Sequence, residues 1–264
     1  MNPTEIRRAA ELLSRSRLTG STIGELPDPC RPVNEIEAYL IQDDLHEYLT
    51  RTKFGRVGGH KIGCTTSVMQ EFLNIRNPCA GGVFASTAQI VEGDFEHEGY
   101  RHVGVECEIA VRLAVPLGSG NGSYNSDSVA GAVAEVMPAI EIVDDRYDDY
   151  ASLGAPTLIA DDFFDAGCVL GDSIGDWRSL DLVSIVGHMR INGIEVGRGR
   201  GGDIMGHPFT ALAWLANLFA RRGKVLKPGE FILLGSVVET QWVQMGDKVE
   251  IDIEGLGRAK AQFH

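Results

Sequence analysis

Residues 103–112 read Val-Gly-Val-Glu-Cys-Glu-Ile-Ala-Val-Arg, an apolar segment interrupted by two carboxylates. Side chains alternate between the two faces of a strand, so Glu106 and Glu108 point to the same side. Glu141 lies in a second apolar segment, Met-Pro-Ala-Ile-Glu-Ile-Val. Like charges that are close together repel, and burying them is costly unless a cation lies between them. The sequence therefore predicts apolar strands whose glutamates share one cation.

Three glutamates supply the hard oxygen ligands that Mg²⁺ or Mn²⁺ prefers, and they leave coordination positions for water and substrate. We therefore predict a divalent metal site at Glu106, Glu108 and Glu141. The alternative is a strand with a wet outer face, on which Glu106 and Glu108 only improve solubility. The spacing alone leaves both interpretations open, because Glu-x-Glu is common in strands.

The bulk composition narrows the class of protein. A chain of 264 residues, 44% hydrophobic and 23% charged, is typical of a soluble globular protein with a sizeable core. Its net charge of −13 argues against nucleic-acid binding, and no apolar run approaches the roughly 20 residues of a membrane span. The five scattered cysteines favour reduced thiols, and the N-terminus lacks a secretion signal. We expect a cytoplasmic protein that draws an anionic substrate in with local cations.

The chain divides into a helical beginning and a β-rich remainder. Segments 4–18 and 34–52 have helical spacing and are joined by a turn-rich linker. A later helix is expected after His207, because Pro208 suits a first turn and Gly223 suits a helix end. We predict a helical cap at 1–54 and a metal-binding catalytic core at 55–264, as one continuous structural unit. The expected strands are 56–63, 82–84, 103–115, 137–143, 166–171, 186–191, 231–234 and 248–254, and the Gly/Ser/Asn stretch 118–128 is expected to be a hairpin loop.

Three further side chains are candidates for chemistry. Lys61, in Gly-Gly-His-Lys-Ile-Gly, could bind a substrate carboxylate or carry a proton, although a lysine standing alone is more often a solvated surface residue. His60 is a weaker acid–base candidate. Ser236 ends the segment Leu-Leu-Gly-Ser and is either an anion-binding hydroxyl or part of a turn. These residues gain weight only as neighbours of the three carboxylates.

Two acidic clusters follow apolar segments and remain ambiguous. Asp161 and Asp162 come after Thr-Leu-Ile-Ala, at the expected end of a strand or loop, and are either catalytic groups or turn caps. Residues 144–146, Asp-Asp-Arg, follow Glu141 and either orient that ligand or form a surface ion pair of little energetic weight.

Eight short motifs follow one another along almost the whole chain: His60-Lys-Ile-Gly-Cys-Thr-Thr-Ser-Val-Met-Gln70, Val105-Glu-Cys-Glu108, Pro138-Ala-Ile-Glu-Ile-Val-Asp-Asp-Arg146, Leu158-Ile-Ala-Asp161, Gly206-His-Pro208, Ala213-Trp-Leu-Ala-Asn217, Leu234-Gly-Ser236 and Gly255-Leu-Gly257. In this order they resemble the 2-keto-4-pentenoate hydratase and 4-oxalocrotonate decarboxylase family of the fumarylacetoacetate hydrolase superfamily. Two stretches depart from the family pattern. Residues 78–82 read Pro-Cys-Ala-Gly-Gly in place of a Pro-Asp-Tyr-Gly-like stretch, and Asp162-Phe-Phe replaces Asn and small residues.

The resemblance implies an α+β fold, with a rolled, mixed β-sandwich core of the fumarylacetoacetate hydrolase C-terminal type under the helical cap. It implies that Glu106, Glu108 and Glu141 bind Mg²⁺ or Mn²⁺, which holds a 2-oxo or 2-hydroxydienoic acid through its carboxylate and 2-oxygen. Lys61 then contacts the substrate and handles a proton. We assign Asp161, like Lys61, as a catalytic candidate. Asp162 and Ser236 are substrate-binding candidates. The resemblance also implies a homo-oligomer, with a hydratase or decarboxylase as a possible partner.

The expected function is that of a metal-dependent lyase in catabolism, which adds water to a 2-hydroxy-2,4-dienoate and forms a 4-hydroxy-2-oxo acid. A 4-oxalocrotonate-type decarboxylase passes through the same type of intermediate, so the metal site does not separate the two. The extra negative charge of Asp162 disfavours a second substrate carboxylate and favours the hydratase. An acylpyruvate-type C–C hydrolase needs a base, for which only His60 is available. The non-enzyme alternative is a non-catalytic partner subunit, against which the retained glutamates and Lys61 argue.

Overall fold

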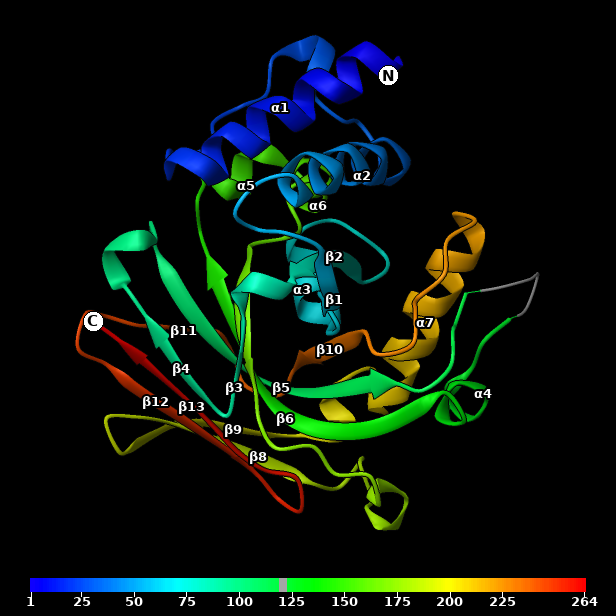
Figure 1. Ribbon diagram of the computed structural model, residues 1–264, viewed down its shortest axis with the longest axis vertical. Coiled ribbons are helices and arrows are strands. Elements are labelled where there is room, and N and C mark those ends of the chain that lie inside the picture. Colours follow the sequence, from blue (N-terminus) through cyan, green and yellow to red (C-terminus); the bar gives the residue numbers. More distant parts are fainter. Residues whose placement is uncertain (119–122) are drawn as a thin grey trace.

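The computed structural model describes residues 1–118 and 123–264, apart from the side chains of residues 67, 68 and 72. Within these residues the chain forms two β-sheets with a group of helices at one end (Figure 1). The α-helices are α1 Pro3–Thr19, α2 Glu35–Thr50, α3 Ser67–Phe72, α4 Ser126–Ala130, α5 Tyr150–Leu153, α6 Ala155–Ala160 and α7 Pro208–Arg221, and the 3-10 helices are η1 Asp28–Cys30, η2 Ala85–Thr87, η3 His97–Gly99, η4 Trp177–Ser179 and η5 Gly201–Asp203.

The larger sheet carries the strand with the paired glutamates. Its hydrogen-bonded order is β2-β1-β10-β5-β6-β7-β3, and β11 adds to β5. Since β2, near one end of this order, also contacts β7, near the other, the sheet rolls up on itself. The strands are β1 Val57–Gly63, β2 Cys79–Phe84, β3 Ala88–Ile90, β5 Val103–Leu113, β6 Val133–Asp144, β7 Asp165–Leu170, β10 Phe231–Ser236 and β11 Gln241–Trp242.

The smaller sheet covers the outer face of this roll, opposite the N-terminal helices (Figure 1). Its order is β4-β13-β12-β8-β9, and β8, β12 and β13 contact β5 or β6. Gly187 of β8 lies against the side chain of Cys107, because any Cβ there would meet the thiol at 3.2 Å. The strands are β4 Glu92–Phe95, β8 Val186–Ile191, β9 Ile194–Arg200, β12 Lys248–Ile253 and β13 Gly257–Phe263.

Both faces of β5 are buried. One face packs on the smaller sheet, and the other faces the inside of the roll, where Ala110 joins a compact apolar cluster. Glu108 is 0% exposed and lies on this inner face. Glu106 lies on the same inner face and is partly buried, so the interpretation of the two glutamates as residues of a wet outer face is wrong. The cluster consists of Val83, Ala110, Met137, Ala139, Cys168, Leu170, Phe231 and Leu233.

The N-terminal helices form where the sequence predicts them. Asn2 caps α1 in a reciprocal hydrogen-bonding arrangement with Glu5, and Gly20 ends the helix in the left-handed conformation. Helix α1 packs on α2, and α2 packs on α6 (Figure 1). The helical layer therefore includes a segment from beyond residue 54, and a division of the chain at that residue remains a prediction.

The α+β architecture and each expected strand are confirmed, most strands with shifted ends, while the sequence did not predict several other elements. Residues 155–160 form a helix, although a strand or loop was expected before Asp161. Strands β3, β4, β9, β11 and β13 were not expected. Of the expected hairpin loop at 118–128, residues 119–122 lie outside the described residues, and α4 begins within the rest. Among the described helices, none has the length and apolar composition to cross a bilayer.

Candidate active site

Strands β5 and β6 bring the three predicted metal ligands together. Glu106 lies directly opposite Glu141 across this antiparallel pair, and Glu108 follows on the same face of β5. One carboxylate oxygen from each residue lies within 4.8 Å of the others. Like charges directly opposite one another destabilise a sheet. The arrangement therefore calls for a cation between the strands.

The unpaired oxygens of this cluster fit a divalent metal ion. Glu108 Oε2 accepts a hydrogen bond from Gly235 N at 2.8 Å, and the hydroxyl of Thr240 donates to Glu106 Oε1. Within the described residues, Glu108 Oε1 and Glu141 Oε2 are buried without a hydrogen-bond partner. Buried polar atoms without partners are rare and costly. The hard oxygen donors left unpaired are those that Mg²⁺ and Mn²⁺ take.

Burial and mutual repulsion raise the pKa values of two glutamates of this cluster. Burial, with a further contribution from Glu141, raises the pKa of Glu106 to about 7. Burial and the neighbouring carboxylates also raise the pKa of Glu108 well above its usual range. Burial by itself lowers the pKa of Lys61, but Glu141 and Glu106 outweigh this effect and raise it. These carboxylates favour the ammonium form of Lys61, which partly neutralises the cluster.

Lys61 is held at the edge of the carboxylate cluster. Its Nζ lies 2.7 Å from Glu141 Oε1 and donates to the carbonyl oxygen of Phe163 at 2.9 Å. The same nitrogen lies 5.3 Å from the centre of the Phe163 ring. The residue is only 3% exposed, so it is not a solvated surface lysine. The structure thus brings Lys61 together with Glu106, Glu108 and Glu141.

His60 lies away from this cluster. Because neighbouring residues of a strand point to opposite faces, the side chain of His60 leaves β1 on the other side from Lys61. Its Nε2 lies 3.6 Å from Glu230 Oε2, and its ring packs on Phe219 of α7 at 4.9 Å between centroids. The assignment of His60 as an acid–base candidate in the site is therefore wrong. A C–C hydrolase mechanism would therefore lack His60 as the base that activates water.

The hydroxyl of Ser236 is engaged by the backbone. It donates to the carbonyl oxygen of Val238 at 2.5 Å and lies 3.2 Å from that of Cys107. Ser236 pairs with Glu108 in the β10–β5 register, so it lies close to the carboxylate cluster. Its substrate-binding role stays a prediction, whereas its turn contacts are observed.

Asp161 is the centre of a buried ion network. Its Oδ1 accepts from Arg17 at 2.7 Å, and its Oδ2 accepts from Arg146 at 2.8 Å and from the hydroxyl of Tyr147 at 3.1 Å. All these partners come from outside the carboxylate cluster. A catalytic role for Asp161 stays a prediction, and these contacts favour a structural role. Arg146 is buried here, so the surface-ion-pair interpretation of residues 144–146 is wrong.

Asp162 is buried and neutralised by neighbouring groups. Its Oδ1 accepts from His46 at 2.7 Å and from Gly82 N at 2.8 Å, and Oδ2 lies 3.1 Å from the Arg17 guanidinium. Burial alone would raise the pKa of Asp162, but His46 and Arg17 outweigh it and lower the pKa to about 2. The charge expected to repel a second substrate carboxylate is therefore compensated. That electrostatic argument for a hydratase does not hold.

Several residues around the site could not be recognised from the sequence. Arg17 and His46 sit in predicted helices, with no signal that they reach the core. Nothing in the sequence around Thr240 indicates a role in the site. Gly235 has one such signal, because a glycine at the end of an apolar strand suggests a close approach of the backbone. Its φ of +122° and a hypothetical Cβ only 2.6 Å from Thr65 Oγ1 explain the glycine. Asp165 opens β7 without any distinguishing pattern.

Asp165 should give the metal-free protein a measurable pH dependence. Burial and the carboxylate of Asp162 raise its pKa from 3.8 to about 8, and its Oδ1 has no partner within the described residues. Between these two values the folded state keeps a proton that the unfolded state has lost. The free energy of unfolding therefore falls as pH rises, by at most about 1.4 kcal/mol per pH unit. Asp165→Asn removes this contribution.

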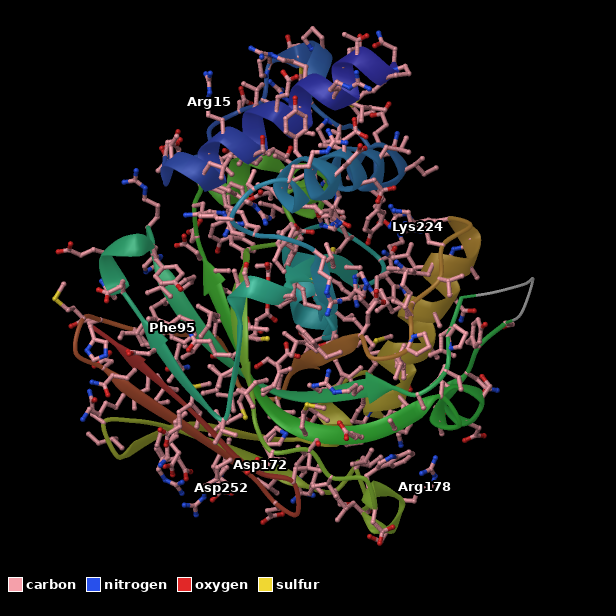
Figure 2. The ribbon with its side chains drawn as sticks, in the orientation of Figure 1. Arg15, Phe95, Asp172, Arg178, Lys224 and Asp252 are labelled. Atoms are coloured by element: carbon pink, nitrogen blue, oxygen red, sulfur yellow. The ribbon has the colours of Figure 1, made fainter. Side chains whose placement is uncertain are left out.

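Urea unfolding with EDTA, from about pH 5 to about pH 8, tests this expectation. The stability of Asp165→Asn relative to the unsubstituted protein should increase steadily with pH. Asp172→Asn, at an exposed position labelled in Figure 2, should change stability little throughout. A difference between Asp165→Asn and the unsubstituted protein that does not vary with pH would show that Asp165 is ionised in the folded state.

The chain is similar to known proteins over its whole length. The family model for the fumarylacetoacetate (FAA) hydrolase C-terminal region matches residues 75–264, and the chain belongs to the FAA hydrolase family. Within it, the chain is 33% identical to the 2-hydroxyhexa-2,4-dienoate hydratase of Comamonas testosteroni, covering 98% of this chain and 96% of the relative. It is 27% identical to the 4-oxalocrotonate decarboxylase of Pseudomonas putida, covering 100% and 98%.

Solved structures agree with this placement. The 4-oxalocrotonate decarboxylase from Pseudomonas putida G7, complexed with magnesium and adipate, superimposes with a TM-score of 0.91 at 24% identity and covers 100% of this chain and 99% of its own. The family and the fold expected from the motifs are thereby confirmed. Identities near 30% do not separate a hydratase from a decarboxylase.

Proposed function

We propose that the protein is a metal-dependent hydratase that adds water to a 2-hydroxy-2,4-dienoate. The observation that carries the proposal is the buried cluster in which Lys61 Nζ lies 2.7 Å from Glu141 Oε1, beside three carboxylates whose oxygens gather within 4.8 Å. The substrate class is supported by relatives such as the 2-keto-4-pentenoate hydratase of Paraburkholderia xenovorans, which is 33% identical over 100% of this chain.

Glu106, Glu108 and Glu141 are the proposed ligands of Mg²⁺ or Mn²⁺. When bound, such an ion supplies Lewis-acid stabilisation of the negative charge that develops on the 2-oxygen of the substrate. The protein holds these carboxylates ready, because Gly235 N and the Thr240 hydroxyl fix two of them by hydrogen bonds.

Lys61 is the proposed proton donor. An ammonium has three N–H groups, and Glu141 and the Phe163 carbonyl engage two of them, which leaves one for the substrate. We propose that Nζ gives a proton to the far carbon of the dienol and regains one from the 2-hydroxyl as the 2-oxo group forms, so that Lys61 ends as an ammonium. Water then adds to the resulting enone, with oxygen at carbon 4 and a proton at carbon 3. The net change is the addition of one water molecule to the substrate.

A decarboxylase of a 2-oxo-enedioate is the alternative reaction. Its diacid substrate calls for a second cation. The nearby guanidinium groups of Arg17 and Arg146 are already paired with Asp161 and Asp162. The ring of Phe163, against Lys61, adds an apolar surface in their place. These features support the substrate with one carboxylate. Self-association stays a prediction of the family resemblance.

The direct test follows the loss of dienol absorbance when purified protein is mixed with 2-hydroxypenta-2,4-dienoate. EDTA should lower the rate at least about 100-fold, because a catalytic metal contributes several kcal/mol, and Mg²⁺ or Mn²⁺ should restore it. In parallel, CO₂ release from a 2-oxo-enedioate reports decarboxylation. Release of CO₂ without dienoate turnover would identify a decarboxylase, and failure of both assays would favour the non-catalytic partner.

A further inference from the structure

The turn at residues 162–164 has an uncommon backbone. Asp162, Phe163 and Phe164 have φ values of 57°, 50° and 68°, so three consecutive non-glycine residues are left-handed. This conformation crowds Cβ against the carbonyl oxygen, and non-glycine residues normally adopt it singly. Neighbouring contacts must therefore hold the turn. The turn positions the carbonyl oxygen of Phe163, which accepts a hydrogen bond from Lys61 Nζ.

Side-chain contacts from the N-terminal helices hold the turn, together with backbone hydrogen bonds such as that from Phe163 N to the carbonyl oxygen of Leu158 at 2.8 Å. His46 of α2 donates to Asp162 Oδ1 at 2.7 Å, and the guanidinium of Arg17, in α1, lies 3.1 Å from Asp162 Oδ2. Gly82 N, in β2, donates to the same Oδ1 at 2.8 Å. The Asp162 side chain is 0% exposed, so these charged contacts are shielded from water. Among the three residues of the turn, only Asp162 has a side chain that can accept such hydrogen bonds.

A second contact ties the same helix to the segment before the turn. Gln42 of α2 donates to the carbonyl oxygen of Ile159 at 2.7 Å and to that of Ala80 at 2.9 Å. Helix α2 therefore spans α6 and β2 at the level of the turn. A shift of α2 would move the Phe163 carbonyl relative to β1, which carries Lys61.

Resting on the proposed function, we propose that His46 and Arg17 are positioning residues for Lys61. Through Asp162 they hold the left-handed turn, whose Phe163 carbonyl keeps the Lys61 ammonium against Glu141. The N-terminal helices thus take part in the reaction without touching the substrate. This goes beyond the metal site, because it assigns a role to residues of the helical cap.

The experiment compares three variants of the full-length protein. His46→Ala removes the donor to Asp162, and His46→Gln retains an N–H of similar reach. The matched control is Asp43→Asn, also in α2. Asp43 pairs with Arg222 at 2.7 Å and with Lys224, labelled just beyond α7 in Figure 2, and it does not contact the turn. Each variant is assayed for kcat, KM, Mg²⁺ affinity and Tm.

We expect His46→Ala to lower kcat by about 100-fold, as for a misplacement of about 1 Å, while KM and Mg²⁺ affinity change little. His46→Gln should recover most of kcat. Asp43→Asn should lower Tm and keep kcat. The proposal fails if His46→Ala retains kcat, if Asp43→Asn lowers kcat to the same extent, or if the loss in His46→Ala is one of Mg²⁺ affinity.

A readout without turnover separates this proposal from the proposed function. The rate at which acetic anhydride acetylates Lys61, followed by mass spectrometry, reports how firmly the ammonium is held. His46→Ala should accelerate labelling of Lys61, whereas Asp43→Asn should not. If the unsubstituted protein turned over no dienoate, the proposed function would fall and labelling alone would decide the positioning role. Equal labelling rates in all variants would overturn it.

Discussion

Glu108→Gln is expected to make the metal-free protein more stable and to abolish its stabilisation by Mg²⁺. The Glu108 carboxyl is buried with one unpaired oxygen, and burial together with Glu141 and Glu106 raises its pKa well above the usual range. At neutral pH the unfolded chain ionises this group freely, whereas the folded protein resists its ionisation. The group therefore costs stability above its unfolded pKa. Glutamine has no such cost, so Tm in EDTA should rise.

The same substitution removes an anionic ligand. Affinity for Mg²⁺ should fall at least about 100-fold, the upper end of what even an indirect partner of a metal site contributes. At a metal concentration 100 times Kd the unsubstituted protein gains about 2.7 kcal/mol from binding, and the variant should gain almost none. Dienoate turnover should be lost in parallel.

Thermal unfolding with EDTA and with Mg²⁺ measures both effects. Glu135→Gln is the matched control, since Glu135 lies on β6, pairs with Arg112 and is partly exposed. It should keep the full response to Mg²⁺. If Glu108→Gln lowered Tm in EDTA and still responded to Mg²⁺, the carboxylate cluster would not be a metal site.

Asp161→Ala is expected to lose about 3–5 kcal/mol of folding free energy, the cost of leaving a buried ion-pair partner uncompensated. Arg146 has a side chain only 9% exposed and loses its carboxylate partner, while Arg17 keeps only Asp162. Since domains are typically stable by about 5–15 kcal/mol, this loss is a large fraction of the total. Urea unfolding measures it, and the milder Asp161→Asn provides a value if the alanine variant does not fold.

An exposed ion pair provides the control for this prediction. Asp252, labelled on the smaller sheet in Figure 2, lies 2.9 Å from Arg258, whose side chain is 61% exposed. Asp252→Asn should cost no more than about 1 kcal/mol, because water screens such pairs. If Asp161→Ala were as mild as Asp252→Asn and yet inactive, Asp161 would be a catalytic residue and not a structural one.

The cluster of three glutamates is the part of the site that the local sequence pattern predicted. The alternation in 103–112 places Glu106 and Glu108 on one face, and the apolar surroundings of Glu141 suggest burial. The contact of Lys61 with Glu141 could only be anticipated through the family resemblance, because β1 and β6 are separated by two other strands of the sheet. The sequence could not show that the charge of Asp162 is compensated, because its partners Arg17 and His46 lie more than a hundred positions away along the chain.

Local periodicity and turn chemistry in the sequence determined the N-terminal helices, the core strands and the two-residue spacing of the glutamates, because these depend on neighbours along the chain. Only the tertiary structure determined which charged side chains contact one another. The rolling of the larger sheet sets Lys61 against Glu141, and the packing of α1 and α2 on α6 delivers Arg17 and His46 to Asp162. Charge compensation in a buried site depends on distance in space and on exclusion of water, and neither is encoded in the spacing of residues along the chain.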